Sequence, residues 1–159
     1  MIRVLITGGT GSFGQAFVFK LLEKIGEIHI RIFSRDEHKQ REFRRRVGAN
    51  DKVSFYIGDV RDRERLSRAV QDCNWVVHAA ALKQAPLGEV EPDEFIKTNI
   101  QGSLNVLQAA HAAGVHKTLL ISSDKAVEPI NLYGATKMCA ERSFLQMDVM
   151  RGFSHRRFA

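Results

Sequence analysis

The chain has 159 residues, of which 44% are hydrophobic and 26% are charged, and its formal net charge is +6. This length allows one domain with a sizeable core, and no apolar run approaches the roughly 18 residues of a membrane span. The two cysteines, Cys73 and Cys139, are too few for a disulfide framework or a metal site. We therefore expect no metal, no membrane association, no signal peptide and a cytoplasmic location.

The first fourteen residues combine an apolar run with evenly spaced glycines. Residues 2–6 predict a buried strand, Gly8, Gly11 and Gly14 follow it, and residues 12–25 predict a helix whose apolar stripe is Phe13, Phe17, Leu21 and Ile25. Gly8 permits a tight turn, Gly11 lets the backbone approach a pyrophosphate, and Gly14 permits close packing of helix and strand. The helix N-terminus adds free N–H groups. We interpret this as a dinucleotide site; a glycine turn that only joins strand and helix is the alternative.

Strands and helices alternate along the rest of the chain. We expect strands at 28–33, 53–57, 75–80 and 118–122, with helices at 36–47, 61–71, 92–113 and 131–147. The long helix opens at Pro92, ends at Gly114, and presents an inner stripe of Ile96, Ile100, Leu104, Leu107 and Ala110. This α/β pattern predicts a doubly wound parallel sheet of strand order 3-2-1-4-5 with helices on both faces. Ligands then bind at the carboxyl ends of the strands.

The end of the second strand indicates the choice of cofactor. An NAD site usually carries a carboxylate there, whereas this chain has Ser34 and Arg35, which suit the 2′-phosphate of NADP. Asp36 comes later and is expected to cap the next helix. Asp59, after the third strand, is placed to accept from the adenine amino group, or else caps the following helix.

A basic cluster between Arg31 and Arg46 carries four of the six net positive charges. Such a cluster can bind nucleic acid, but it can also bind one phosphate or form a solvated helix face. We favour the phosphate together with the solvated face, and expect no nucleic-acid partner.

Tyr133 and Lys137 stand four residues apart, on one face of the last predicted helix. A free tyrosine has a pKa near 10, which a lysine cation and a bound nicotinamide cation would lower. Tyr133 is therefore a candidate acid and base for a sugar or alcohol hydroxyl. Ser122 and Ser123 precede it by ten or eleven residues.

Several segments together resemble a known family. TGGTGSFG, HAAA, TNIQG and YGATK are similar to the extended short-chain dehydrogenases/reductases, which have a Rossmann-like fold. Within that family, SRDEHKQ, GDVRDRERL, HAAALKQAP and ISSDKAVEPINLYGATK resemble the configuration-inverting UDP-N-acetylglucosamine 4,6-dehydratases, lyases of capsule, flagellin-sugar and lipopolysaccharide biosynthesis. The resemblance covers residues 2–147, and its specific part is Ser123-Asp124-Lys125.

The resemblance implies a cycle of oxidation, elimination and reduction. Tyr133 would deprotonate the sugar 4-hydroxyl while C4 gives a hydride to NADP+, and Lys137 would hold the nicotinamide ribose. Once C4 is a ketone, the proton at C5 is acidic. The hydride returns to C6, and reprotonation of C5 from the opposite face inverts that centre.

The remaining catalytic roles also come from the resemblance. Ser123 would bond the reacting oxygen, Lys125 would remove the C5 proton, and Asp124 would protonate the departing 6-hydroxyl. Asn99 would hold a water or a backbone carbonyl near the site, and Lys83 would lie near the substrate.

The cofactor contacts expected from the motifs and the resemblance come from all the predicted strand ends. They are Thr7, Gly8, Thr10, Gly11, Ser12, Phe13, Gly14, Ser34, Arg35, Asp59, Val60, Ala79, Ala80, Ala81, Lys83, Asn99, Ser122, Tyr133 and Lys137.

For these roles the Asp124 carboxyl would need to be protonated and the Lys125 amine would need to be neutral. Two adjacent groups of this kind instead favour the ion pair of carboxylate and ammonium. We expect an extended loop that points their side chains in opposite directions; an exposed turn pair is the alternative.

Members of the family are about twice this length, and their second half binds the nucleotide sugar. We therefore expect an NADP-binding domain at 1–150, an irregular tail at 151–159, and a truncated chain without a substrate domain. The expected function is a nucleotide-sugar 4,6-dehydratase that converts a UDP-sugar. An NADP-binding module without turnover and a UDP-sugar 4-epimerase remain alternatives. An exposed sheet edge and an uncovered helix face favour a homo-oligomer.

Overall fold

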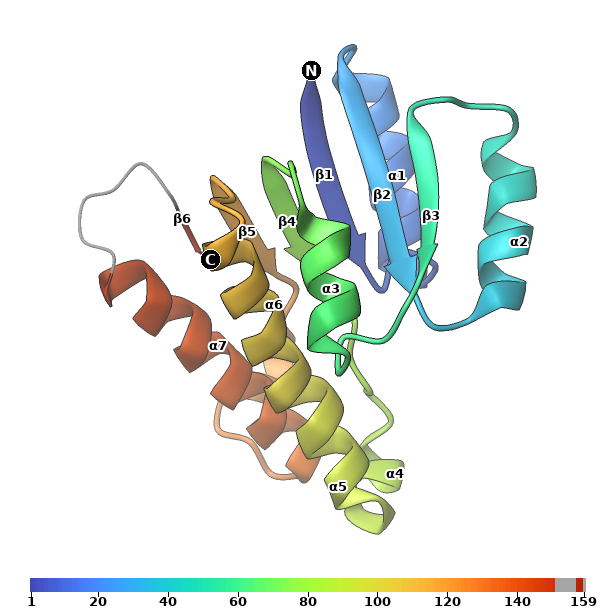
Figure 1. Cartoon of the computed structure of the whole chain (residues 1–159). Coiled ribbons are helices and arrows are strands. Elements are labelled where there is room, and N and C mark those ends of the chain that lie inside the picture. The colour runs from blue at the N-terminus through green and yellow to red at the C-terminus, as the bar shows by residue number, and fades with distance from the viewer. Residues whose placement is uncertain (151–156, 159) are drawn as a thin grey trace.

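A computed structural model describes residues 1–150 and 157–158. Strands and helices alternate from the N-terminus as the sequence predicts (Figure 1). The strands are β1 (Ile2–Thr7), β2 (Ile28–Ser34), β3 (Val53–Ile57), β4 (Trp75–His78), β5 (Lys117–Leu120) and β6 (Arg157–Phe158). The helices are α1 (Ser12–Lys24), α2 (Glu37–Val47), α3 (Arg63–Val70), α4 (Ala85–Val90), α5 (Pro92–Phe95), a π-helix (Ile96–Gln101), α6 (Gly102–Ala112), a short 3-10 helix (Asp124–Ala126) and α7 (Leu132–Met150).

The strands form one parallel sheet of order β3-β2-β1-β4-β5-β6. This confirms the predicted order 3-2-1-4-5. The expectation of an irregular tail at 151–159 is wrong for Arg157–Phe158, which pair with Lys117 and Thr118 of β5. A strand pair needs only backbone donors and acceptors, which the edge of β5 offers, so charged side chains do not prevent it. The rest of the predicted tail lies outside the described residues.

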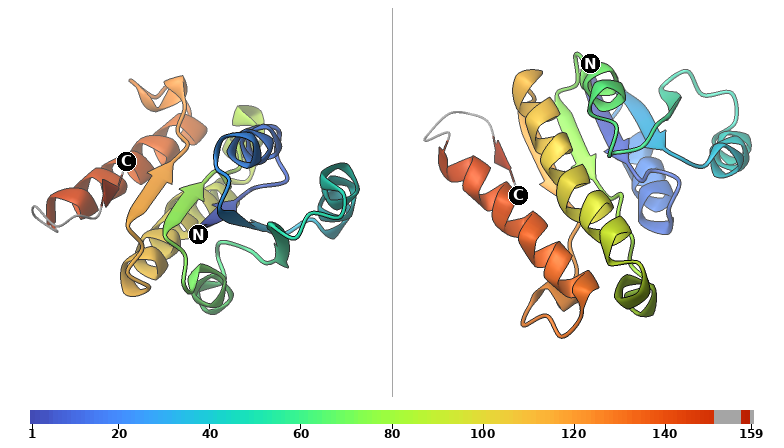
Figure 2. Two further views of the ribbon diagram at one scale, coloured as in Figure 1. Left: turned by 90° about the horizontal axis from the view of Figure 1, so that it is seen from above. Right: turned by 60° about the horizontal axis from the view of Figure 1, so that its bottom comes forward.

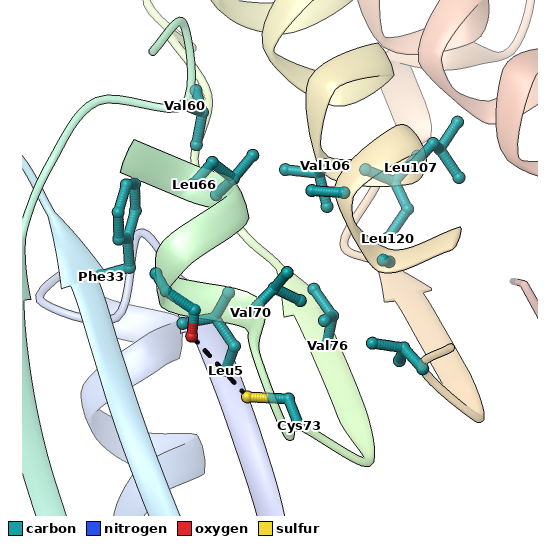
Figure 3. Close-up of a cluster of buried hydrophobic side chains, with 14 of the residues drawn as sticks. Leu5, Phe33, Val60, Leu66, Val70, Cys73, Val76, Val106, Leu107 and Leu120 are labelled. Atoms are coloured by element: carbon teal, nitrogen blue, oxygen red, sulfur yellow. Dashed lines mark hydrogen bonds between the residues drawn. The ribbon is translucent and has the colours of Figure 1, made fainter. Parts of the chain in front are cut away.

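Two apolar cores cover the two faces of the sheet. Alternate residues of β1 divide between them: Val4 and Ile6 pack with α1 and α2, whereas Leu5 packs with α3, α6 and α7. Figure 3 shows the second core, where Leu66 and Val70 of α3 meet Val106 and Leu107 of α6. α6 and α7 run side by side along this face (Figures 1 and 2). The helices cover the two faces of the sheet, so a ligand can bind at the carboxyl ends of the strands.

The buried face of α1 differs from the predicted stripe. Gly14, Val18 and Leu21 are buried, whereas Phe13 is 41% exposed and stacks on Phe17 at 5.3 Å between ring centroids. The predicted stripe is therefore confirmed at Leu21, and at Phe17 and Ile25, which are partly buried against the same core, but it is wrong at Phe13. Close packing at Gly14 brings this side of the helix against the glycine turn after β1.

The long helix that was expected from Pro92 is interrupted. The π-helix inserts an extra residue per turn between α5 and α6, and a separate short helix, α4, precedes Pro92. The predicted inner stripe is confirmed at Leu107 and Ala110, and at Leu104, which is partly buried against the same core, but it is wrong at Ile96, which is 44% exposed. Because the π-turn shifts the phase of the helix, other residues fill the inner positions, namely Phe95 just before the π-helix and Thr98 and Asn99 within it.

A buried histidine connects the end of β1 to α6. His78 Nδ1 lies 2.6 Å from Thr7 Oγ1, and its Nε2 lies 3.0 Å from Ser103 Oγ. The Ser103 hydroxyl donates to the Asn99 carbonyl, so it accepts from His78 Nε2–H, and His78 Nδ1 accepts from Thr7. Burial, together with the charge of Lys137, lowers the pKa of His78 to about 3. The histidine is therefore neutral in the folded protein.

Acid is expected to destabilise the fold through this histidine. In the unfolded chain the pKa of His78 returns to about 6.5, so between pH 6.5 and pH 3 the unfolded state binds more protons and the free energy of unfolding falls as the pH falls. At pH 5 the loss is about 2 kcal/mol. Urea unfolding of wild type and of His78→Asn, measured across this range, should show a shallower pH dependence in the variant.

Exposed His116 provides the control, because His116→Asn should keep the wild-type pH dependence. Equal slopes for wild type and His78→Asn would contradict the assignment.

No helix within residues 1–150 is both long and apolar enough to cross a membrane.

Candidate functional site

A pocket of about 520 Å³ lies at the carboxyl ends of the strands, where the predicted site residues meet. It is lined by the turn after β1, the ends of β2, β3, β4 and β5, and the first turns of α7. These elements come together because the carboxyl ends of parallel strands share one edge of the sheet.

Most of the predicted cofactor contacts line this pocket. They are Gly8, Thr10, Gly11, Ser12, Phe13, Gly14, Ser34, Arg35, Asp59, Val60, Ala79, Ala80, Ala81, Lys83, Ser122, Tyr133 and Lys137. Thr7 and Asn99 lie behind the lining. The pocket also includes residues that the sequence analysis did not select, namely Phe33, Asp36, Lys39, Gly58, Thr98 and Ile121. All six lie within a few residues of a strand end or on the long helix, so topology was the signal that could have found them.

The glycine turn fits a group that approaches the backbone closely. Gly8 has φ +68, and a Cβ there would lie 2.7 Å from the Ala80 nitrogen. A Cβ on Gly14 would lie 2.5 Å from Gly9 Cα, so Gly14 allows the helix to pack on the turn itself. A Cβ on Gly11 would meet only the Gly8 carbonyl, at 3.2 Å. Gly11 therefore keeps the backbone bare beside the N-terminus of α1, as a pyrophosphate requires.

Two hydroxyls in the pocket lining lack a protein partner. Among the described residues, Thr98 Oγ1 and Ser122 Oγ are buried without a hydrogen bond. Buried polar groups are rarely left unpaired, so a polar ligand in this pocket would account for both.

Charged side chains of both signs gather at the end of the pocket beside β2 and β3. Arg35 Nη1 lies 3.6 Å from Asp59 Oδ2, and Arg61 binds the same oxygen at 2.7 Å. Partial burial works to raise the pKa of Asp59, but the hydrogen bonds and charge of Arg61, with Arg35, outweigh it and hold that pKa below its usual range. Asp59 Oδ1 also accepts from the Arg61 backbone.

Two aspartates cap the helices that follow these strands. Asp62 caps α3, so the alternative that Asp59 caps this helix is wrong, although Asp59 does lie in the turn that precedes it. Asp36 caps α2 as predicted, by accepting from the backbone N–H of Lys39.

Tyr133 and Lys137 line the other end of the pocket. Tyr133 is only 8% exposed and Lys137 only 4%. The Lys137 ammonium donates to the Ile121 carbonyl at 2.7 Å. Burial lowers the pKa of Lys137 to about 8, partly offset by Glu141, so the side chain is mainly cationic at neutral pH. A phenol and a cation thus face one pocket, where a hydroxyl group of a substrate could exchange its proton.

The Ser123-Asp124-Lys125 segment lies outside the pocket lining. The expected extended loop with diverging side chains is wrong, because Asp124 and Lys125 begin a 3-10 helix. In this tighter turn Lys125 Nζ lies 3.3 Å from Asp124 Oδ2, and Ser123 Oγ donates to Asp124 at 3.0 Å. The hydrogen bond from Ser123, followed by the contact with Lys125, lowers the pKa of Asp124. The alternative of an exposed turn pair describes this arrangement.

Gly134 joins this segment to α7. A Cβ on Gly134 would lie 2.2 Å from the Lys125 carbonyl oxygen. Only glycine allows this approach, so the segment at 123–125 is packed directly against the helix turn that carries Tyr133. Sequence reasoning did not select Gly134, although it follows Tyr133 directly.

Asn99 holds backbone near the site, as the resemblance implies. Its side chain accepts from Leu82 N at 2.8 Å and donates to Leu82 O at 2.9 Å. It also donates to Thr136 Oγ1 at 3.0 Å, and Thr136 donates to the Tyr133 carbonyl. Asn99 therefore ties the loop after β4 to the first turn of α7.

Comparison with known proteins identifies relatives over the whole chain. The sequence profile of a family described as "Polysaccharide biosynthesis protein" matches residues 4–159. A UDP-N-acetylglucosamine 4,6-dehydratase (inverting) of Campylobacter jejuni is 47% identical over 157 residues, which is 99% of this chain and 47% of that protein. A UDP-glucose 4-epimerase of Rickettsia bellii is 50% identical over 142 residues, which is 87% of this chain and 41% of that protein.

Solved structures share the fold. Pen from Bacillus thuringiensis has a TM-score of 0.94 at 36% identity, over 99% of this chain and 48% of that one. DesIV, a dTDP-glucose 4,6-dehydratase from Streptomyces venezuelae solved with NAD and TYD, has a TM-score of 0.87 at 26% identity, over 95% of this chain and 53% of that one. The chain thus spans about half the length of the curated relatives it matches.

Proposed function

Since this chain belongs to the polysaccharide biosynthesis protein family, we propose that it binds NADP+ and carries the catalytic residues of a UDP-N-acetylglucosamine 4,6-dehydratase. The observation that carries the proposal is one pocket with a glycine turn at one wall and Tyr133 with Lys137 at another. The 47% identity to the inverting dehydratase of Campylobacter jejuni supports the substrate and the inversion at C5.

The cofactor would be held from one end of the pocket to the other. The bare backbone around Gly11 and the α1 N-terminus would bind its pyrophosphate, and Ser34 with Arg35 would bind its 2′-phosphate. Asp59 and Val60 would lie at the adenine. Ser122 and Lys137 would contact the nicotinamide half, where the unpaired Ser122 hydroxyl supplies a free hydrogen-bonding group.

A bound nicotinamide cofactor supplies a hydride acceptor and, later, a hydride donor. The chain's own residues move the protons. Tyr133 would take the proton of the sugar 4-hydroxyl, because the cation of Lys137 favours the phenolate form. Ser123 would bond the same sugar oxygen, which requires its hydroxyl to turn away from Asp124. Asn99 keeps the first turn of α7 in place.

The acid and base roles of Asp124 and Lys125 require that this pair be covered. In the described residues both are exposed, with 84% and 54% of their side chains accessible, which favours the ion pair. Covering the pair disfavours both charges, so it raises the pKa of the acid and lowers that of the lysine. The remaining half of the curated relatives' length is the natural source of such a cover, and we propose that turnover requires an equivalent polypeptide. Self-association of this chain is the other possible cover.

Two alternative functions can be distinguished from the proposed dehydratase. The similarity to the Rickettsia bellii protein, at nearly the same identity, supports a UDP-sugar 4-epimerase, and an NADP-binding module without turnover is the second alternative. The Asp124-Lys125 pair supports dehydration, since epimerisation needs neither an acid at O6 nor a base at C5.

The test combines cofactor titration with product analysis. Calorimetric titration with NADP+ and NAD+ should show preference for NADP+. Incubation with UDP-N-acetylglucosamine should give a product lighter by one water when the remaining half of a relative is added, and the incubation without that half serves as the comparison. A product of unchanged mass identifies an epimerase, and cofactor binding without a product in either incubation identifies the module. Preference for NAD+ would contradict the 2′-phosphate assignment.

A further inference from the structure

A buried amide stands directly behind the predicted 2′-phosphate site. Gln40 of α2 is 5% exposed, and Ser34, at the end of β2, is 8% exposed and lines the pocket. Gln40 Nε2 lies 3.0 Å from Ser34 Oγ, 3.0 Å from Ser34 O and 2.8 Å from Tyr56 O. This one amide nitrogen therefore ties α2 to the ends of β2 and β3.

These contacts fix the direction of the hydrogen bonds. The two backbone carbonyls can only accept, so the amide atom that faces them must be the nitrogen. An amide nitrogen donates and does not accept, and its two hydrogens serve three acceptors, so one N–H is shared between Ser34 O and Ser34 Oγ. The Ser34 hydroxyl therefore faces Gln40 with a lone pair and keeps its own hydrogen. Among the described residues, the structure shows no other hydrogen bond to this hydroxyl. Its hydrogen is available to an acceptor in the pocket.

Each neighbouring carboxylate already has cationic and backbone partners. Asp59 is bound by Arg61 through its side chain and its backbone. Asp36 accepts from the Lys39 backbone and lies 3.7 Å from the Lys39 ammonium. A ribose 2′-hydroxyl needs an acceptor for its hydrogen, whereas a 2′-phosphate needs donors and positive charge. This end of the pocket offers the donors, from Ser34 and Arg35, close to the N-terminus of α2.

We propose that Gln40 is a positioning residue that sets the cofactor preference of the pocket. By occupying the acceptor side of Ser34 Oγ, it holds this hydroxyl as a donor and so favours an anionic group on the adenosine ribose over a hydroxyl. The inference rests on the proposed function and names one residue through which its cofactor selectivity arises.

Replacement of Gln40 with glutamate tests the inference. A carboxylate accepts the Ser34 hydrogen and adds a negative charge, so Gln40→Glu should lower the ratio of NADP+ to NAD+ affinity about tenfold or more. Gln40→Met keeps the length of the side chain without donors, and should lower the same ratio by about threefold because the hydroxyl becomes free to rotate. Gln108→Glu, an exposed site on α6, makes the same charge change and should leave the ratio unchanged.

The dissociation constants of both cofactors and the melting temperature are measured for the full chain and each variant. If wild type prefers NADP+ and either folded Gln40 variant lowers the ratio as stated, the inference holds. If wild type prefers NADP+ but the folded variants weaken both cofactors equally, Gln40 is only structural and the inference is wrong, while the proposed function stands. A wild-type preference for NAD+ overturns the proposed cofactor and this inference together.

Discussion

Tyr133→Phe is expected to lower the rate of dehydration by about 100- to 10,000-fold, the usual contribution of a positioned acid or base. Phenylalanine keeps the ring that fills this nearly buried position, and it removes only the hydroxyl that takes the substrate proton. Affinity for NADP+ should change by less than about fivefold, since at most one neutral hydrogen bond is lost. Product formation and calorimetric titration, on the chain with its complementing half where that half is required, measure the two effects.

Tyr56→Phe is the matched control, because Tyr56 is the other tyrosine of the chain and lies in β3, away from the lining of the pocket. It should retain wild-type turnover. Tyr133→Phe with an unchanged rate would assign the proton transfer to another group. An equal loss in both variants would indicate an effect of protein stability instead.

Gly14→Ala is expected to abolish cofactor binding and to lower the free energy of unfolding by about 3 kcal/mol, the upper end for inserting a methyl group into a packed site. The added Cβ would meet backbone atoms of Gly9 at 2.5 to 2.7 Å, and backbone cannot give way as a flexible side chain does. The helix and the glycine turn must therefore separate, which takes the N-terminus of α1 away from the pyrophosphate site. Urea unfolding and NADP+ titration measure the two losses.

Gly26→Ala is the control, because a Cβ at Gly26 meets nothing within 4 Å. It should leave both stability and binding close to wild type. Retention of NADP+ affinity in Gly14→Ala would show that the pyrophosphate does not depend on this packing.

The order of the strands and the position of the pocket could be predicted from the sequence, because both depend on the regular alternation of strands and helices. Alternating strands and helices fix a parallel sheet, and such a sheet collects the residues after each strand at one edge. Gly8, Ser34, Asp59 and Tyr133 therefore line one pocket although they are far apart in the sequence.

Local departures from regular geometry could not be predicted in this way. The 3-10 turn that pairs Asp124 with Lys125 depends on the close approach of Gly134 to the Lys125 carbonyl, a tertiary contact. The role of Gln40 depends on the convergence of α2, β2 and β3 on one amide. In the sequence Gln40 is one polar residue among the charges of a basic helix, and nothing marks it as buried.

Because of the π-helix at 96–101, the packing of this segment depends more on its number of residues than on which residues they are. The turn holds one residue more than a regular helix needs, so removal of Ile96 would allow regular α-helical pairing while rotating the preceding turn by about 100°. Phe95, now fully buried, would then face solvent. Exposed Ile96 should consequently accept many substitutions but not its own deletion, and a scan of single-residue deletions would reveal a constraint at this position that a substitution scan cannot detect.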